Sequence, residues 1–269
     1  MNKYGECLQF ISQNFASFLD KPFIYEKNAF LALKLGKNNL AVENILKALE
    51  RNSENLIYYL YFFMANGIKA NLEKMNDLML LSPSDKQLGI KLLAELRGKK
   101  VKSRISERIE LILASGEEFK LEICSYITHN IKQNIPSILN AIKSVYDHQK
   151  EKVTVITEII TSHIDSIRSN NCLNIDYTNN ERLDLMTQIS WLYYFAAMHF
   201  DYLRDLEKAM EYINISIDIT PSVNEFYQLK SKILKHAGML KESTDAYEKV
   251  KHSQINSLTK LGQKIGCWR

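Results

Sequence analysis

The sequence predicts an all-α protein, a solenoid of helical hairpins. The 269 residues include only nine glycines and four prolines, less than half the usual share, so the chain has few of the breakers that an all-β fold needs. Apolar residues recur at helical spacing through most of the chain. A pattern of small and large residues also recurs with a period of 34 residues, which is the mark of a repeat architecture.

The clearest repeat is "SWLYYFAAMHFDYLRDLEKAMEYINISIDITPSV", residues 190–223. Ala196 and Ala197 stand where a first helix meets its partner, and Ala209 is the small contact of the second helix. Two helices cross closely only where both carry small side chains, and larger residues fill the grooves beside them. The remaining matches are Phe200 on the first helix, Asp205 and Leu206 in the turn, Ile213 on the second helix and Pro221 at the end. This layout matches the tetratricopeptide (TPR) pattern and predicts a TPR-like α-α superhelix.

Two further units fall in the same frame. Residues 224–257 repeat the layout, with Gly238 in the turn, Ser243 34 residues after Ala209, and Tyr227 34 residues after Tyr193. Residues 22–55 form the third unit, with matches at Tyr25, Ala29, Gly36, Ala41, Ile45 and Ala48. A chance amphipathic hairpin matches fewer of these positions, so the three units support one another.

The stretch between the repeats is less regular, with helical periodicity over much of 56–167. Its apolar run "LIYYLYFFMA", 56–65, is ten residues long, whereas a membrane span needs about 20, so we expect a buried core helix. We also expect helix at the β-branched run 153–161, because no second strand accompanies it. The asparagine-rich stretch 168–182 is predicted to be a polar loop. We expect one domain, a helical solenoid over 1–269.

Composition excludes several classes of protein. Hydrophobic residues are 46% and charged residues 25%, as in ordinary soluble proteins. The net charge of +4 is too mild to indicate a dedicated nucleic-acid binder. The four cysteines form no CxxC pair, which favours a reducing, cytoplasmic setting without disulfides or a zinc site, and the start "MNKYGECLQF" is not a secretory signal.

Sequence motifs of catalysis are missing. The chain contains no GxG, no P-loop and no HExxH, and its six histidines are scattered. An acetyltransferase of the usual fold needs a strand and a glycine-rich loop to hold the pyrophosphate of acetyl-CoA. We therefore predict no catalytic residues, no metal site and no required cofactor.

The elbow "KILKHAGMLKES", 232–243, gathers cations around Gly238. Lys232 and Lys235 are three residues apart and share a helix face, with His236 beside the turn. One repeat earlier, Tyr202 stands 34 residues before His236, so stacking brings the two positions close. Two interpretations are open: the cations complement a helix C-terminus, or they hold an anion.

The basic run "RGKKVKSRISER", 97–108, has six cations and one acid. One interpretation is a solvated turn and helix face. The other is a non-specific, salt-sensitive contact to ribosomal RNA.

Taken together, the segments resemble a known family, the auxiliary, ribosome-anchoring subunit of the NatA N-terminal acetyltransferase. The matching text, from about residue 27 to the end, is "ALERNSENLIYY", "LASGEEFK", "IPSILNAIKSVYDHQKEKV", "HFDYLRDLEKAMEYIN", "ITPSVNEF" and "KILKHAGMLKE". The family fold is a long TPR superhelix wrapped around a small catalytic subunit. The parent chain is far longer, so this sequence resembles its middle segment, and "KIGCWR" stops within an expected repeat.

The resemblance implies a function and a site. It implies a non-catalytic scaffold that binds the catalytic acetyltransferase subunit and helps place it at the ribosome. It also implies inositol hexakisphosphate held near the elbow by Lys232 and Lys235, with His236 and Tyr202 as further candidates; Leu234 stands where the family often has a tyrosine. The candidate partner contacts are Trp191, Tyr194 and His199.

Two other functions stay open. The first alternative is a generic TPR adaptor that binds a peptide or chaperone tail. A carboxylate clamp would need cations and asparagines on successive first helices, whereas repeat 190–223 offers Tyr193, Ala197 and Phe200. The second is a direct RNA binder, which would need a larger basic excess than +4.

Overall fold

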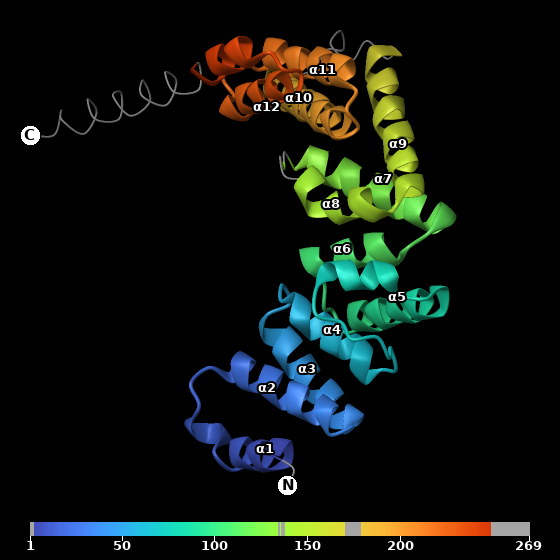
Figure 1. The fold of residues 1–269 in the computed structure, drawn as a ribbon, viewed down its shortest axis with the longest axis vertical. Coiled ribbons are helices and arrows are strands. Elements are labelled where there is room, and N and C mark those ends of the chain that lie inside the picture. Colours follow the sequence, from blue (N-terminus) through green and yellow to red (C-terminus); the bar gives the residue numbers. More distant parts are fainter. Residues whose placement is uncertain (1–2, 134, 136–137, 170–178, 249–269) are drawn as a thin grey trace, which may run out of the picture. The chain divides into compact units, whose positions relative to one another are not determined.

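The computed structural model describes residues 3–133, 135, 138–169 and 179–248, and every regular element in these ranges is a helix (Figure 1). The chain forms two compact units. The first contains Met1–Ile123 and Ile142–Lys152, and the second contains Cys124–Ala141 and Val153–Arg269. The expected all-α fold is therefore confirmed for the described residues.

The first unit is a succession of helices that pack mainly on their chain neighbours (Figure 1). Its elements are α1 (Lys3–Gln13), η1 (Phe15–Ser17), α2 (Lys21–Lys34), α3 (Asn38–Arg51), α4 (Leu56–Ala65), η2 (Met75–Leu80), α5 (Pro83–Gly98), α6 (Arg104–Leu113), the first part of α7 (Gly116–Lys132) and most of α8 (Ile138–His148).

Helices α2 and α3 form the hairpin expected at 22–55. Asp20 caps α2 by accepting a hydrogen bond from the amide of Phe23 at 3.0 Å. Gly36 lies in the turn with φ of +68°, a left-handed conformation that glycine adopts without strain. The small residues Ala29, Ala41 and Ala48 have no exposed surface, so the two helix backbones approach closely.

Helix α4 is the core helix predicted from the apolar run. Tyr59 and Phe63 have no exposed surface. The Tyr59 hydroxyl donates to the carbonyl of Ser53 at 2.9 Å and lies 2.8 Å from Oγ of Ser103. This aromatic side chain can be buried because its one polar atom has partners.

The second unit contains the end of α7, the start of α8, most of α9 (Lys150–Ser169), α10 (Asn179–Tyr202), α11 (Leu206–Ile219), α12 (Asn224–His236) and a further helical segment, 240–248. The β-branched run 153–161 lies inside α9, which confirms the helix prediction. The predicted loop 168–182 is wrong at both ends, because 168–169 end α9 and 179–182 begin α10. Residues 170–178 lie outside the described residues.

Helices α10 and α11 form the hairpin expected at 190–223. Ala196, Ala197 and Ala209 have no exposed surface, and Phe200 and Ile213 are buried beside them. Helix α12 and segment 240–248 form the next hairpin, and the rest of repeat 224–257 lies outside the described residues.

A single turn geometry joins all three hairpins. Gly36, Arg204 and Gly238 have φ of 68°, 65° and 77°, and each is fifteenth in its 34-residue repeat. In the third hairpin, the amide of Met239 bonds to the carbonyl of Leu234 at 2.9 Å, which closes the end of α12. The chain therefore repeats a backbone conformation as well as a pattern of side chains.

Candidate functional site

The last turns of α10 and α12 bring an acidic side chain against a lysine and a histidine. The Asp201 side chain is only 2% exposed. Its Oδ1 lies 2.6 Å from Nδ1 of His236, and its Oδ2 lies 3.4 Å from Nζ of Lys232. All three residues belong to the second unit.

The position of Asp201 explains why it needs these partners. A carboxylate in the last turn of a helix faces the negative end of the macrodipole, and burial removes the water that would otherwise solvate it. Lys232 and His236, four residues apart on α12, supply the compensating hydrogen bond and charge. These two side chains therefore hold α12 against α10.

The predicted anion-binding residues are close to one another, but part of their charge is already balanced. Lys232, Lys235 and His236 all lie in the last five residues of α12. Lys235 is exposed, and Tyr202 is half-buried at the end of α10, directly after Asp201. Polyphosphate binding at these residues stays a prediction, and any such ligand has to compete with Asp201 for Lys232 and His236.

Sequence reasoning did not identify Asp201. It paired Tyr202 with His236 by the 34-residue period, whereas the hydrogen bond between His236 and a carboxylate comes from the residue before Tyr202, Asp201. Asp201 stands 31 residues before Lys232 and 35 before His236. An acidic residue about one repeat period before Lys232 and His236 is the sequence signal that would have predicted this contact.

The predicted partner-binding aromatics pack on one another. Trp191 meets Tyr194 edge-on at 5.2 Å between ring centroids and meets the buried Phe226 of α12 at 5.1 Å. Burial raises the pKa of Tyr194 to about 12. Both side chains are half-buried, so they join α10 to α12 and still offer part of their surface.

His199 does not fit the partner-binding prediction. Its side chain has no exposed surface, and Nε2 lies 2.8 Å from Oγ1 of Thr157 on α9. Burial lowers the pKa of His199 to about 4, so the ring is neutral at pH 7. A side chain buried in this way packs the core of the second unit.

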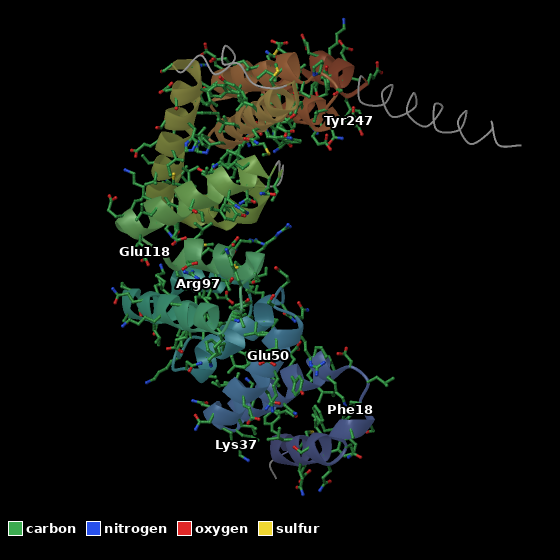
Figure 2. All side chains as sticks on the ribbon, turned by 180° about the vertical axis from the view of Figure 1, so that it is seen from behind. Phe18, Lys37, Glu50, Arg97, Glu118 and Tyr247 are labelled. Carbon is green, nitrogen blue, oxygen red and sulfur yellow. The ribbon has the colours of Figure 1, made fainter. Side chains whose placement is uncertain are left out.

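The basic run 97–108 ends α5 and begins α6. Arg97, labelled in Figure 2, pairs with Glu110 at 2.5 Å, and Lys102 lies 3.4 Å from Glu107. Ser103 caps α6 by accepting from the amide of Ser106 at 3.0 Å. Lys99, Lys100 and Arg104 are exposed, as expected for a solvated turn and helix start, whereas Val101 and Ser103 are buried. The RNA contact stays a prediction.

The described part of the chain shows neither a metal centre nor a membrane span. No group of three or more His, Cys, Asp or Glu side chains there has an arrangement that suits a metal ion. None of the described helices is both long enough and apolar enough to span a bilayer.

The chain is similar to known proteins over most of its length. A family model described as N-terminal acetyltransferase A, auxiliary subunit, matches residues 1–254. The human protein N-alpha-acetyltransferase 16, NatA auxiliary subunit, is 30% identical over 238 residues, and its mouse counterpart is 31% identical over 242 residues; these matches cover 88% and 90% of this chain. The Arabidopsis thaliana N-terminal acetyltransferase A complex auxiliary subunit NAA15 is 23% identical over 245 residues, 88% of this chain.

A solved structure supports the fold. A chain in the structure of Naa15/Naa10 bound to HypK-THB matches with a TM-score of 0.74 at 21% identity, over 93% of this chain and 34% of that chain. The chain spans about a quarter of the length of the curated relatives it matches. Because the family model matches nearly the whole chain, we conclude that this chain belongs to the family of NatA auxiliary subunits.

Proposed function

We propose that this chain is part of a non-catalytic scaffold that binds the catalytic subunit of an N-terminal acetyltransferase. The observation that carries the proposal is the family match over residues 1–254. The hairpin fold agrees with it, since stacked hairpins offer an extended surface to a partner. The matching solved structure also contains Naa15 together with Naa10.

Co-purification tests this proposal. The 269-residue chain is co-expressed with a tagged catalytic subunit of the same complex, and retention of the chain on the tag is measured. The chain alone is expected to transfer no acetyl group from acetyl-CoA to a peptide starting with Ser or Ala. Turnover by the chain alone, or no retention by the catalytic subunit, would contradict the scaffold function.

The scaffold is also proposed to act in the cytoplasm and to help place the enzyme at the ribosome. The exposed cations Lys99 and Lys100, between α5 and α6, suit a salt-sensitive contact to ribosomal RNA. Ribosome sedimentation at rising salt tests the contact. Changing both lysines to Glu is expected to reduce co-sedimentation, whereas changing the exposed Lys91 and Lys120 to Glu serves as a control of equal charge.

The elbow is proposed to hold inositol hexakisphosphate as a structural ligand at the partner interface. Lys235 faces solvent, and Lys232 keeps 61% of its side chain exposed although it pairs with Asp201. Each exposed contact contributes about 1 kcal/mol or less, so the isolated chain should bind weakly and the complex more tightly.

Titration calorimetry on the chain with its catalytic partner tests the elbow from both directions. Lys232→Glu with Lys235→Glu should weaken polyphosphate binding. Asp201→Asn should tighten it, because removal of the acid releases Lys232 and His236 to the ligand. The control is again Lys91→Glu with Lys120→Glu. Equal polyphosphate affinities in the wild type and the three variants would limit the elbow to a structural role.

A further inference from the structure

A pocket of about 590 Å³ lies in the first unit, far along the chain from the elbow. It is formed by α2, the start of α3, α4 and the segment 68–73 that follows α4. All of its lining residues belong to the first unit. The family comparison and the proposed scaffold function give this pocket no role.

The floor of the pocket is apolar and aromatic. Phe30 of α2 and Tyr61 of α4 are half-buried, with ring centroids 6.1 Å apart and planes tilted by 38°. Leu33, Ile57 and Met64 add aliphatic surface beside them. Such a floor can take one large apolar side chain, and the flexible methionine lets it adapt to different shapes.

The rim of the pocket carries two lysines for which the described residues supply no acidic partner. Lys34 and Lys69 are both exposed and line the opening. No described carboxylate pairs with either one, whereas Lys27 and Lys47 on α2 and α3 pair with their neighbours Glu26 and Glu43 at 3.0 Å and 2.5 Å.

Other rim groups add hydrogen bonding and limit the charge. Asn38 adds an exposed side-chain amide to the lining of the pocket. The acid of the rim, Glu73, accepts a hydrogen bond from Nδ2 of Asn71 at 2.9 Å. Nζ of Lys34 lies over the Phe30 ring, 5.4 Å from its centroid, so one cation of the rim also contacts the floor. The charge around the apolar floor is therefore mainly positive.

We propose that this pocket binds a short segment of a partner protein that places one large apolar side chain on the floor and a carboxylate beside Lys34 and Lys69. The apolar floor supplies the anchor, and the two cations set the sign of the neighbouring charge. A nucleobase fits less well, because Phe30 and Tyr61 lean against each other and leave no parallel slot between them.

Fluorescence polarisation tests the proposal with the complete chain and a fluorescein-labelled peptide, GSDDLFDDSG. Two matched peptides accompany it: GSKKLFKKSG reverses the charge, and GSDDSSDDSG removes the apolar anchor. We expect the first peptide to bind and each control to bind at least tenfold more weakly, which corresponds to about 1.4 kcal/mol.

Protein variants locate the binding. Lys34→Glu with Lys69→Glu is expected to weaken the acidic peptide at least tenfold, while Lys91→Glu with Lys120→Glu changes its affinity less than twofold. Met64→Ala is expected to weaken the peptide with the Leu-Phe anchor and to leave the anchorless one unaffected. Circular dichroism confirms that each variant is folded.

Three results would overturn the proposal: no binding of the acidic peptide, equal binding of the charge-reversed peptide, or equal loss in the two double-lysine variants. Displacement of the peptide by oligouridine RNA through Lys34 and Lys69 would assign the pocket to nucleic acid instead. These outcomes are independent of whether the chain binds a catalytic subunit.

Discussion

The hairpins α2–α3 and α10–α11 use the same backbone with different interiors. Ala41 and Ala209 are twentieth in their repeats and have no exposed surface, and Gly36 and Arg204 share the left-handed turn position. Two hairpins far apart in the chain therefore use small residues at the same repeat positions for the helix crossing. That set is what makes the repeat visible in the sequence.

The difference between the two hairpins lies in their buried polar groups. The first buries Asn44, whose amide donates to the carbonyl of Leu40 within its own helix at 2.8 Å. The second buries His199 and Asp201, whose partners are on α9 and α12. Contacts of this kind link α10–α11 specifically to its neighbours. The buried imidazole of His199, whose pKa burial lowers to about 4, also makes the second hairpin sensitive to pH.

The largest predicted effect is a loss of stability of the second unit in acid through His199. The pKa is about 4 in the folded chain and 6.5 when unfolded, so the unfolded chain alone takes up the proton between these values. The contribution of His199 to the free energy of unfolding is therefore full above pH 6.5, falls as the pH drops, and is lost below pH 4. This difference between the two pKa values corresponds to a loss of about 3 kcal/mol in the free energy of unfolding.

Tryptophan fluorescence in a Trp268→Phe background measures this loss, because Trp191 then reports unfolding of the second unit. His199→Gln keeps a hydrogen-bonding side chain but does not titrate. The difference in unfolding free energy between pH 7 and pH 4 should be smaller in the variant by about 3 kcal/mol. The same pH dependence in both proteins would show that His199 is not the titrating group.

A second prediction tests what the two hairpins share. Ala41→Leu and Ala209→Leu each force a larger side chain into a closed helix crossing, and each should cost about 2 kcal/mol. Urea unfolding followed by circular dichroism measures the cost. Glu207→Leu on the exposed face of α11 is the control and should change stability by about 0.5 kcal/mol or less. A large loss at only one of the two alanines would mean that the hairpins are not equivalent.

The features that the sequence predicted depend on residues close together in the chain. The hairpins and the helix at 153–161 follow from local spacing of small and apolar residues, and the structure contains them. The start of α10 was missed because an asparagine-rich run resembles a loop, although 179–182 are helical.

The candidate site was predicted only in part for a different reason. Lys232, Lys235 and His236 of α12 lie within five residues of one another, so the sequence alone predicted them as a group. Asp201 and the burial of His199 depend on how α10 is rotated against its neighbours. That rotation follows from the packing of three helices, and the 34-residue period alone places these residues only to within one position.

A third prediction concerns the turn, where the two hairpins carry different residues in one conformation. Gly36→Ala should cost about 1 kcal/mol, because an L-residue is strained at φ of +68°. Arg204→Gly should stabilise the second hairpin by about 0.5 kcal/mol, since relief of the same strain is partly offset by the greater freedom of glycine in the unfolded chain. Opposite signs in urea unfolding would support the shared turn, and equal signs would contradict it.

The smallest predicted effect extends the comparison to the third hairpin. Ser231 and Ser243 occupy the repeat positions of Ala197 and Ala209 in the second hairpin and of Ala29 and Ala41 in the first. Each serine hydroxyl donates to the carbonyl of the other residue at 2.8 Å, and the two hydroxyl oxygens lie 3.0 Å apart. The crossing is therefore closed by hydroxyl groups where the other two hairpins use methyl groups.

Replacing both serines with alanine restores the residue type of the other two hairpins. The lost hydrogen bonds, about 1 kcal/mol each, are offset by the higher helix propensity of alanine and by carbonyls that keep partners within their own helices. We expect the double variant to change the unfolding free energy by about 0.5 kcal/mol or less, measured by Trp191 fluorescence in the Trp268→Phe background. A loss above about 2 kcal/mol would instead show that the third hairpin requires its hydroxyl pair, and that small size alone does not define this repeat position.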